Sequence, residues 1–242
     1  MPLLFTELDH VGVLRQAGGG RDPDPAHVAV LAELAGAGGI SVTYTRGASG
    51  FQERDLRVLR DVVRTVFTLC LPPQDDLVKV ALALRPDLVT LIPEPREPYG
   101  VERGLDVEDR RAELAACIDT LKGGKIPVVL LVDPLPQQIK AAQRAGAGGV
   151  RLHTGRFSWA ADQAARAAEY EALLNGAKVA QRLGLPVHAG GGIGYQTVGA
   201  IAQIPEVDAV VVGHGFVARA VLVGVAEAVR ELLRVMREGA AR

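Results

Sequence analysis

Eight short apolar segments alternate with segments of helical periodicity along the chain, and this alternation constrains the fold more than any other feature. The strands are expected at residues 3–8, 39–45, 66–71, 87–92, 128–132, 149–153, around Val187 and at 209–212. The helices are expected at 27–35, 55–65, 75–84, 107–121, 136–145, within 159–183, at 197–204 and at 217–238, and the glycine-rich segment 17–25 is expected to be a loop. Alternation of this kind favours parallel βαβ units with right-handed crossovers. Eight such units in 242 residues predict an α/β fold, a single (β/α)8 TIM barrel domain over residues 1–242, with a doubly wound open sheet as the weaker alternative.

The composition excludes several classes of protein. The formal net charge is -1 and charged residues make up 23% of the chain, so no binding to nucleic acid or to a membrane surface is expected. Cys70 and Cys117 lie in different expected elements and form no CxxC pair, which argues against a disulfide framework. The N-terminus lacks a signal-peptide pattern and no apolar run approaches 18 residues, so we expect a cytoplasmic protein without a membrane segment.

The last two expected strands each run into glycines that precede a helical segment. Residues 186–194 read PVHAGGGIG, and residues 208–215 read DAVVVGHG. Glycine lets backbone N–H groups approach an anion closely, and the N-terminus of a helix adds a favourable dipole. The pattern predicts a phosphate site after strands 7 and 8 of the barrel. The alternative is that these glycines only form tight turns.

Polar side chains also stand where the other expected strands end, which is the rim that carries the active site of a TIM barrel. Four of the five histidines of the chain lie at the ends of strands that neighbour one another in a closed barrel. These are His10, His153, His188 and His214. Their spacing contains no H-x-H or HExxH pattern, so we expect no metal, and no cofactor is expected either.

Each candidate side chain has a structural alternative. His188 can be a core histidine that points into the barrel, and Cys70 is more commonly a buried apolar side chain than a nucleophile. Glu94 and Asp133 can supply acid–base chemistry or can neutralise Arg96 and Arg151.

Motifs along nearly the whole chain resemble those of the pyridoxine 5'-phosphate synthases, the (β/α)8 enzymes of vitamin B6 biosynthesis. They are Leu8-Asp-His10 with Leu14-Arg15, Pro23-Asp-Pro25, Arg54-Asp-Leu-Arg57, Pro93-Glu94, Gly104-Leu-Asp-Val107, Gln138-Ile-Lys-Ala-Ala142, His153-Thr-Gly155, Ala189-Gly190 and Gly213-His214 with Arg219-Ala220. The resemblance implies a transferase that condenses 3-amino-2-oxopropyl phosphate with 1-deoxy-D-xylulose 5-phosphate to give pyridoxine 5'-phosphate. It also implies a homo-oligomer, an octamer built from dimers.

Two sets of binding residues carry over from the resemblance. Gly192, Gly213 and His214 match the positions that hold the amino-oxopropyl phosphate. Asp9 and His10 match positions that contact the deoxyxylulose phosphate. A phosphorylated small molecule is therefore the expected ligand.

The catalytic positions do not carry over. Where the family has a histidine base, a glutamate base, a further glutamate and a histidine acid, this chain has Thr43, Cys70, Arg151 and Gly191. Other family side chains are replaced by Glu7, Gly18, Thr45, Gly50 and Gly100. Positioned proton transfers contribute roughly 10²–10⁴-fold each, so we predict that the efficient family reaction is lost.

Three readings of the function remain open. The chain is a synthase that uses substitute residues such as His188, Arg151 and Glu7, or a diverged enzyme that uses Asp9, His10, His188 and Glu94 on another phosphorylated substrate. The third reading is a non-catalytic protein that binds a phosphorylated ligand.

Overall fold

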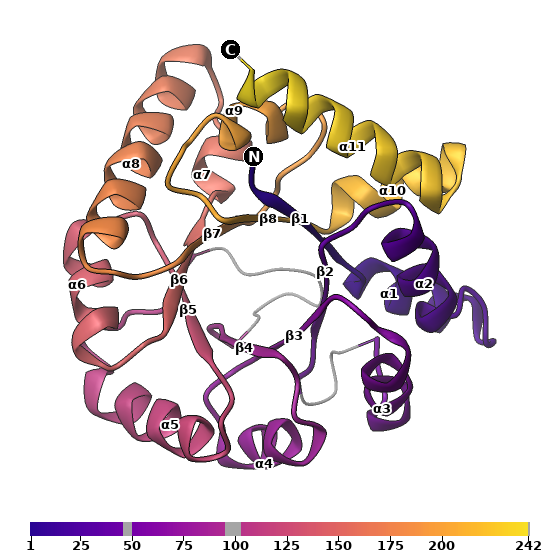
Figure 1. The fold of residues 1–242 in the computed structure, drawn as a ribbon, viewed down its shortest axis with the longest axis horizontal. Coiled ribbons are helices and arrows are strands. Elements are labelled where there is room, and N and C mark those ends of the chain that lie inside the picture. Colours follow the sequence, from indigo (N-terminus) through magenta and orange to yellow (C-terminus); the bar gives the residue numbers. More distant parts are fainter. Residues whose placement is uncertain (46–49, 95–102, 242) are drawn as a thin grey trace.

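Eight parallel strands form a closed barrel in the computed structural model, which describes residues 1–45, 50–94 and 103–241 (Figure 1). The strands are β1 (Leu3–Glu7), β2 (Gly39–Thr43), β3 (Val66–Leu71), β4 (Leu88–Leu91), β5 (Val128–Val132), β6 (Gly149–His153), β7 (Val187–Gly190) and β8 (Ala209–Val212). The helices of the described residues are α1 (Asp9–Gly18), α2 (Pro25–Leu34), α3 (Glu53–Val62), α4 (Asp75–Leu84), α5 (Arg111–Gly123), α6 (Pro136–Arg144), α7 (Gly155–Ser158), α8 (Gln163–Arg182), α9 (Val198–Ala202), α10 (His214–Val223) and α11 (Val225–Ala240).

The first and last strands close the barrel. β1 pairs with β2 on one side and with β8 on the other, where Leu3 lies opposite Ala209 and Thr6 lies opposite Val212. The predicted TIM barrel is therefore confirmed, and the open sheet is wrong. Because every strand pair is parallel, all eight carboxyl ends meet at one rim.

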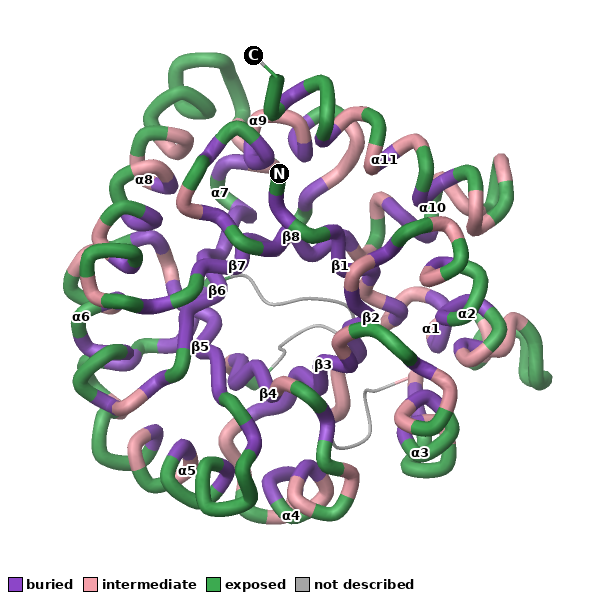
Figure 2. The backbone as a smooth tube through the Cα atoms, viewed as in Figure 1, coloured by how far each residue is buried: buried purple, intermediate pink, exposed green. Residues whose placement is uncertain are grey.

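Buried side chains lie on both faces of the strands. β5, with the sequence VVLLV, is buried at every position, and Figure 2 shows the strands as a buried ring inside more exposed helices. The main core lies between strands and helices. Two smaller clusters of strand and rim side chains lie apart from it, one formed by Phe5, Ala209 and Val211 and the other by Cys70, Ile92 and Leu131. The second of these clusters is the floor of the site described below.

Three helical segments differ from the expected ones. The residues that follow β1 form α1, where the sequence suggested no helix, and the short helix α7 follows β6 directly. The single helix expected at 217–238 is two helices, because the chain turns at Gly224 with φ +85° and α10 begins already at His214. Glycine adopts such a positive φ without the steric cost that other residues have.

A bidentate ion pair fixes α1 against α3. The guanidinium of Arg15 donates to both carboxylate oxygens of Asp55 at 2.8 and 2.6 Å, and to the carbonyl of Gly50 at 2.8 Å. Paired hydrogen bonds of this kind are among the stronger polar contacts in proteins. The motifs at residues 14–15 and 54–57 therefore have a structural role, which is to hold the segment after β1 at the rim.

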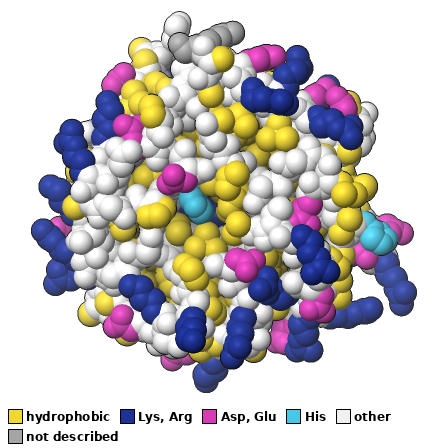
Figure 3. Space-filling view, in the orientation of Figure 1, with side chains coloured by type: hydrophobic (Ala, Val, Ile, Leu, Met, Phe, Trp, Pro, Cys, Tyr) yellow, Lys and Arg dark blue, Asp and Glu magenta, His cyan; other side chains and the backbone are white. Residues whose placement is uncertain are grey.

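The surface carries charges of both signs. On the face seen in Figure 3, Lys and Arg side chains lie around the periphery with Asp and Glu among them, and hydrophobic side chains lie nearer the centre. A continuous basic surface of the kind that binds nucleic acid does not occur on this face. Across the part of the chain that the structure describes, the helices are too short or too polar to cross a bilayer.

Candidate functional site

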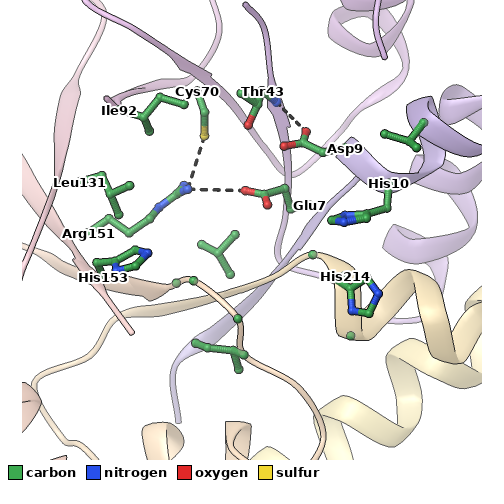
Figure 4. Close-up of a pocket in the computed structure, with 18 of the residues that line it drawn as sticks. Glu7, Asp9, His10, Thr43, Cys70, Ile92, Leu131, Arg151, His153 and His214 are labelled. Carbon is green, nitrogen blue, oxygen red and sulfur yellow. Dashed lines mark hydrogen bonds and ion pairs between the residues drawn. The ribbon is translucent and has the colours of Figure 1, made fainter. Parts of the chain in front are cut away.

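A cavity of about 400 Å³ opens at the carboxyl ends of the strands. It brings together thirteen of the residues singled out from the sequence, several of which are labelled in Figure 4. These are Glu7, Asp9, His10, Thr43, Thr45, Gly50, Cys70, Arg151, His153, Gly191, Gly192, Gly213 and His214. The cavity is therefore the candidate site.

Three candidate acid–base residues lie outside the cavity lining, His188, Glu94 and Asp133, and the Oδ1 of Asp133 accepts a hydrogen bond of 2.9 Å from the Gly104 N–H. His188 is buried in the barrel with its ring edge-on to Phe5, at 5.5 Å between ring centroids, and it does not line the cavity. Burial and the neighbouring Arg151 lower its pKa to about 3, so its imidazole is neutral near pH 7. Glu94 is exposed, also lies outside the cavity lining, and accepts a hydrogen bond from Gln74. Arg96 and Gly100 fall outside the described residues.

Glycines of two turns line one end of the cavity. After β7 the chain turns through Gly191 (φ +119°) and Gly192 (φ +68°), and after β8 the helix α10 begins directly beyond Gly213. A Cβ on Gly215 would lie 3.0 Å from the Gly194 Cα and the Ile193 carbonyl oxygen, so the two turns pack backbone against backbone. The first N–H groups of a helix have no partner within it. This end of the cavity can therefore bind an anion.

Residues of α7 and its ends hold the glycine turn. The hydroxyls of Thr154 and Ser158 donate to the Gly191 carbonyl at 2.6 and 3.2 Å. The Trp159 ring covers Gly192, where a Cβ would lie 2.7 Å from the indole. Sequence reasoning missed Ser158 and Trp159 as site residues. The available signal was their position immediately after the His153-Thr-Gly155 motif.

Two histidines of the cavity lining contact each other. The rings of His10 and His214 meet edge to face with centroids 5.0 Å apart. Burial and the nearby His214 lower the pKa of His10, which is therefore neutral near pH 7. Among the described residues, no group of three or more His, Cys, Asp or Glu side chains has the arrangement of a metal site.

A buried arginine occupies the centre of the cavity floor. Arg151 is only 4% exposed, and its Nη1 lies 3.7 Å from the Glu7 Oε2 and 3.4 Å from the Cys70 Sγ (Figure 4). Burial raises the pKa of Glu7 to about 8, the nearby Asp9 adds to the shift, and Arg151 opposes it. Near pH 7 the Glu7 carboxyl therefore mostly carries a proton.

The two groups beside Glu7 also have raised pKa values. Burial raises the pKa of Asp9, although its Oδ1 accepts a hydrogen bond of 2.7 Å from the Thr43 N–H. Burial likewise raises the pKa of the Cys70 thiol, in spite of Arg151. Cys70 is thus a neutral thiol, and the nucleophile hypothesis finds no support in its surroundings.

Gly50 and Gly191, two positions where the family resemblance implies a larger side chain, are closed by close packing. A Cβ on Gly50 would lie 2.5 Å from the backbone carbon of Gly12, and a Cβ on Gly191 would lie 2.9 Å from the ring of His153. Contacts this close require the surrounding atoms to move. The glycines therefore fit a site whose walls stand closer together than a larger side chain permits.

Comparison with known proteins supports one family. The family model described as "Pyridoxal phosphate biosynthesis protein PdxJ" matches residues 4–238. The chain is 44% identical to the pyridoxine 5'-phosphate synthase of Synechococcus sp. (strain JA-2-3B'a(2-13)) over 96% of this chain and 98% of that protein. It is 43% identical to the protein of the same name from Syntrophobacter fumaroxidans, with the same coverage.

Solved structures of lower identity share the fold. Thiamine phosphate pyrophosphorylase from Pyrococcus furiosus has a TM-score of 0.62 at 19% identity and covers 98% of this chain and 96% of its own. KGPDC from Streptococcus mutans has a TM-score of 0.67 at 16% identity and covers 98% of both chains. At these identities the likeness supports the barrel and nothing more specific.

Substitution of Gly191 by alanine tests whether that position is closed. Gly191→Ala should destabilise more than Gly184→Ala, because both glycines have positive φ but a Cβ on Gly184 meets no atom within 4 Å. We expect a difference of about 1–3 kcal/mol in the free energy of unfolding, measured with urea. Equal losses would mean that His153 moves aside freely and that the position is open.

Substitution of Glu7 by glutamine tests the raised pKa. The pKa of Glu7 rises from 4.5 to about 8 on folding, so the wild-type protein loses stability as the pH rises through this interval, whereas glutamine does not ionise. Because Glu7 is 24% exposed, solvent moderates the effect. We expect Glu7→Gln to match the wild type near about pH 5 and to be more stable by about 1–2 kcal/mol near about pH 9.

The matched control is Glu113→Gln. A hydrogen bond from Arg110 lowers the pKa of Glu113, so this variant should be slightly less stable than the wild type at neutral and high pH. Urea denaturation across the pH range distinguishes the gain in stability expected for Glu7→Gln from the loss expected for Glu113→Gln. If Glu7→Gln shows no gain at high pH, the Glu7 carboxyl is ionised at little cost.

Proposed function

Because the chain belongs to the family of the pyridoxal phosphate biosynthesis protein PdxJ, we propose that its rim cavity binds a phosphorylated small molecule. One observation carries this proposal. The turns after β7 and β8 and the first turn of α10 face the same cavity as His214. Backbone N–H groups and the helix dipole stabilise a phosphate there without a basic side chain.

We also propose that the chain catalyses the condensation implied by the family resemblance only slowly. The hydroxyl of Thr43 is not a base near neutral pH, and Gly191 has no side chain. Burial keeps the Cys70 thiol neutral. Loss of positioned proton transfers lowers a rate by roughly 10²–10⁴-fold each, and such losses are not additive. The 44% identity to named synthases supports a related ligand, and the replaced side chains support a different catalytic capacity.

A second candidate is another reaction on a phosphorylated substrate. It is favoured by Glu7, since a carboxyl with a pKa of about 8 exchanges protons efficiently near neutral pH. Asp9 and His10 line the same cavity and would contact the substrate beside it. A non-catalytic ligand-binding role is the third possibility.

Apolar side chains on the outer helices support the homo-oligomer expected from the family resemblance. Leu34 on α2 is 80% exposed, and Val221 and Leu222 on α10 are 69% and 75% exposed. α1 contacts both α2 and α10, so the helices that carry these side chains lie near one another on the outside of the barrel (Figure 1). Burial of such side chains against another copy is favourable.

A direct assay tests the slow family reaction. We expect purified protein, incubated with 3-amino-2-oxopropyl phosphate and 1-deoxy-D-xylulose 5-phosphate, to form pyridoxine 5'-phosphate at least about 10³-fold more slowly than the Synechococcus relative does. The relative, assayed in parallel, controls for substrate quality. A rate within about tenfold of the relative's would mean that the chain is a synthase working with substitute residues.

Substitution of Gly213 by aspartate tests the phosphate site. A Cβ at this position would lie 2.8 Å from the Glu7 Oε1, and the added carboxylate would repel an anion at the start of α10. We expect Gly213→Asp to weaken binding of sn-glycerol 3-phosphate at least about tenfold by isothermal titration calorimetry. Gly184→Asp adds the same charge to the loop before β7, at the opposite rim, and should leave the affinity unchanged. Equal affinities in the two variants would refute the site.

A further inference from the structure

Arg151 is a buried cation that has no strong hydrogen-bond acceptor among the described residues. Its Nε and Nη2 make no hydrogen bond to the described residues. Its Nη1 contacts the sulfur of Cys70, which is a weak acceptor, and stands 3.7 Å from Glu7, beyond hydrogen-bond distance. Burial of a guanidinium without such acceptors costs free energy, and binding of an anion offsets this cost.

The described residues place no carboxylate within hydrogen-bond distance of this guanidinium. Among the described residues, the acidic side chains that face Arg151 are Glu7 on β1, which is mostly protonated near pH 7, and Asp9 on α1, whose Oδ1 already accepts the Thr43 N–H at 2.7 Å. The remaining neighbours that interact electrostatically with it are Cys70 and His188, and both are neutral near pH 7. The cavity floor is thus a place where an external negative charge is stabilised.

The shape of the floor suggests the kind of anion. The aliphatic stem of Arg151 lies beside Gly190, where a Cβ would stand 3.3 Å from the Arg151 Cδ. Ile92 and Leu131 form apolar walls, and among the described lining residues Arg151 is the one Lys or Arg side chain. A single cation between apolar walls suits a monoanion, and the planar guanidinium matches a carboxylate.

The floor is close to the phosphate end of the cavity. One oxygen of Glu7 lies against Gly213, at the start of α10, and the other faces Arg151. The two anion-binding features are therefore separated by about the width of one carboxyl group. A ligand that spans them needs only a short carbon chain.

We propose that Arg151 binds a carboxylate of the ligand, so that the ligand is a phosphorylated carboxylic acid with a short carbon chain. The inference rests on the proposed function, because the phosphate of this ligand occupies the glycine end. The carboxylate approaches the guanidinium from the cavity, binds Nη1 beside the Glu7 carboxyl, and gains Nη2 after a small rotation of the guanidinium. Arg151 then acts as the specificity-determining residue of the site.

The test compares two probes of equal carbon number. 3-Phosphoglycerate carries a phosphate and a carboxylate, whereas sn-glycerol 3-phosphate carries a hydroxymethyl group in place of the carboxylate. Calorimetry should show that the wild-type protein binds 3-phosphoglycerate roughly 10- to 100-fold more tightly. Arg151→Met should abolish this preference and keep the affinity for sn-glycerol 3-phosphate within about twofold.

Two further variants complete the test. Arg151→Lys keeps the charge without the planar pair of donors, and should retain part of the preference even if Arg151→Met does not fold. Arg156→Met removes an exposed arginine that pairs with Glu169 and should leave the preference intact.

The outcomes separate this inference from the proposed function. If the wild-type protein binds both probes equally, the carboxylate assignment is overturned and the phosphate site stands. A preference that survives in Arg151→Met also overturns the assignment. If the preference depends on Arg151 but Gly213→Asp has no effect on either probe, the contact between Arg151 and the carboxylate stands, and the proposed position of the phosphate at the glycine end is overturned. If neither probe binds, both proposals fail.

Discussion

Pairing of β1 with β8 is the constraint on which the site depends. The hydrogen bonds between these strands convert a row of eight parallel strands into a ring, and they bring Glu7 of β1 beside Gly213, the residue that follows β8. In an open sheet these two residues would lie on opposite edges. Closure therefore assembles the cavity from both ends of the chain, and it leaves the strands without an exposed edge.

The same closure determines the electrostatics of the floor. Side chains that point inward from several strands share a small volume that water reaches only from the rim, so burial shifts the pKa of each titratable group toward its neutral form. Arg151 keeps its charge because guanidinium is a very weak acid. The result is one persistent cation among side chains that are mostly neutral near pH 7. A chain with glutamates at positions 70 and 151 would instead have acidic groups and no cation on the cavity floor.

The sequence predicted the barrel well because its information is local and repeated. Strands such as 66–71 and 128–132 are continuous apolar runs between helix and turn signals, and the structure has them at the same bounds. The helix α1 was not expected, since its ten residues are only weakly apolar and glycine-rich; its position depends on the tertiary ion pair of Arg15 with Asp55. The break at Gly224 was missed because the apolar spacing continues through it.

The sequence predicted which residues form the site better than it predicted how these residues are arranged. Strand ends and the family resemblance together identified most of the lining residues, because position along a strand is enough to place a side chain at the rim. Nothing in the sequence indicated that Gly12 and Gly50 touch, or that Gly191 lies under His153, since both contacts join segments far apart in the chain. The neutral state of Cys70 likewise follows from burial, which is a property of the folded chain.

Trp159 gives the phosphate end an additional property. It is the single tryptophan of the chain, it is 67% exposed, and its indole rests on Gly192 in the turn after β7. The tryptophan fluorescence of the protein, which lies at longer wavelengths than the tyrosine emission, therefore comes from one ring at the entrance of the cavity. Any change in the solvation of that turn alters the emission directly, so the chain carries its own optical reporter of occupancy.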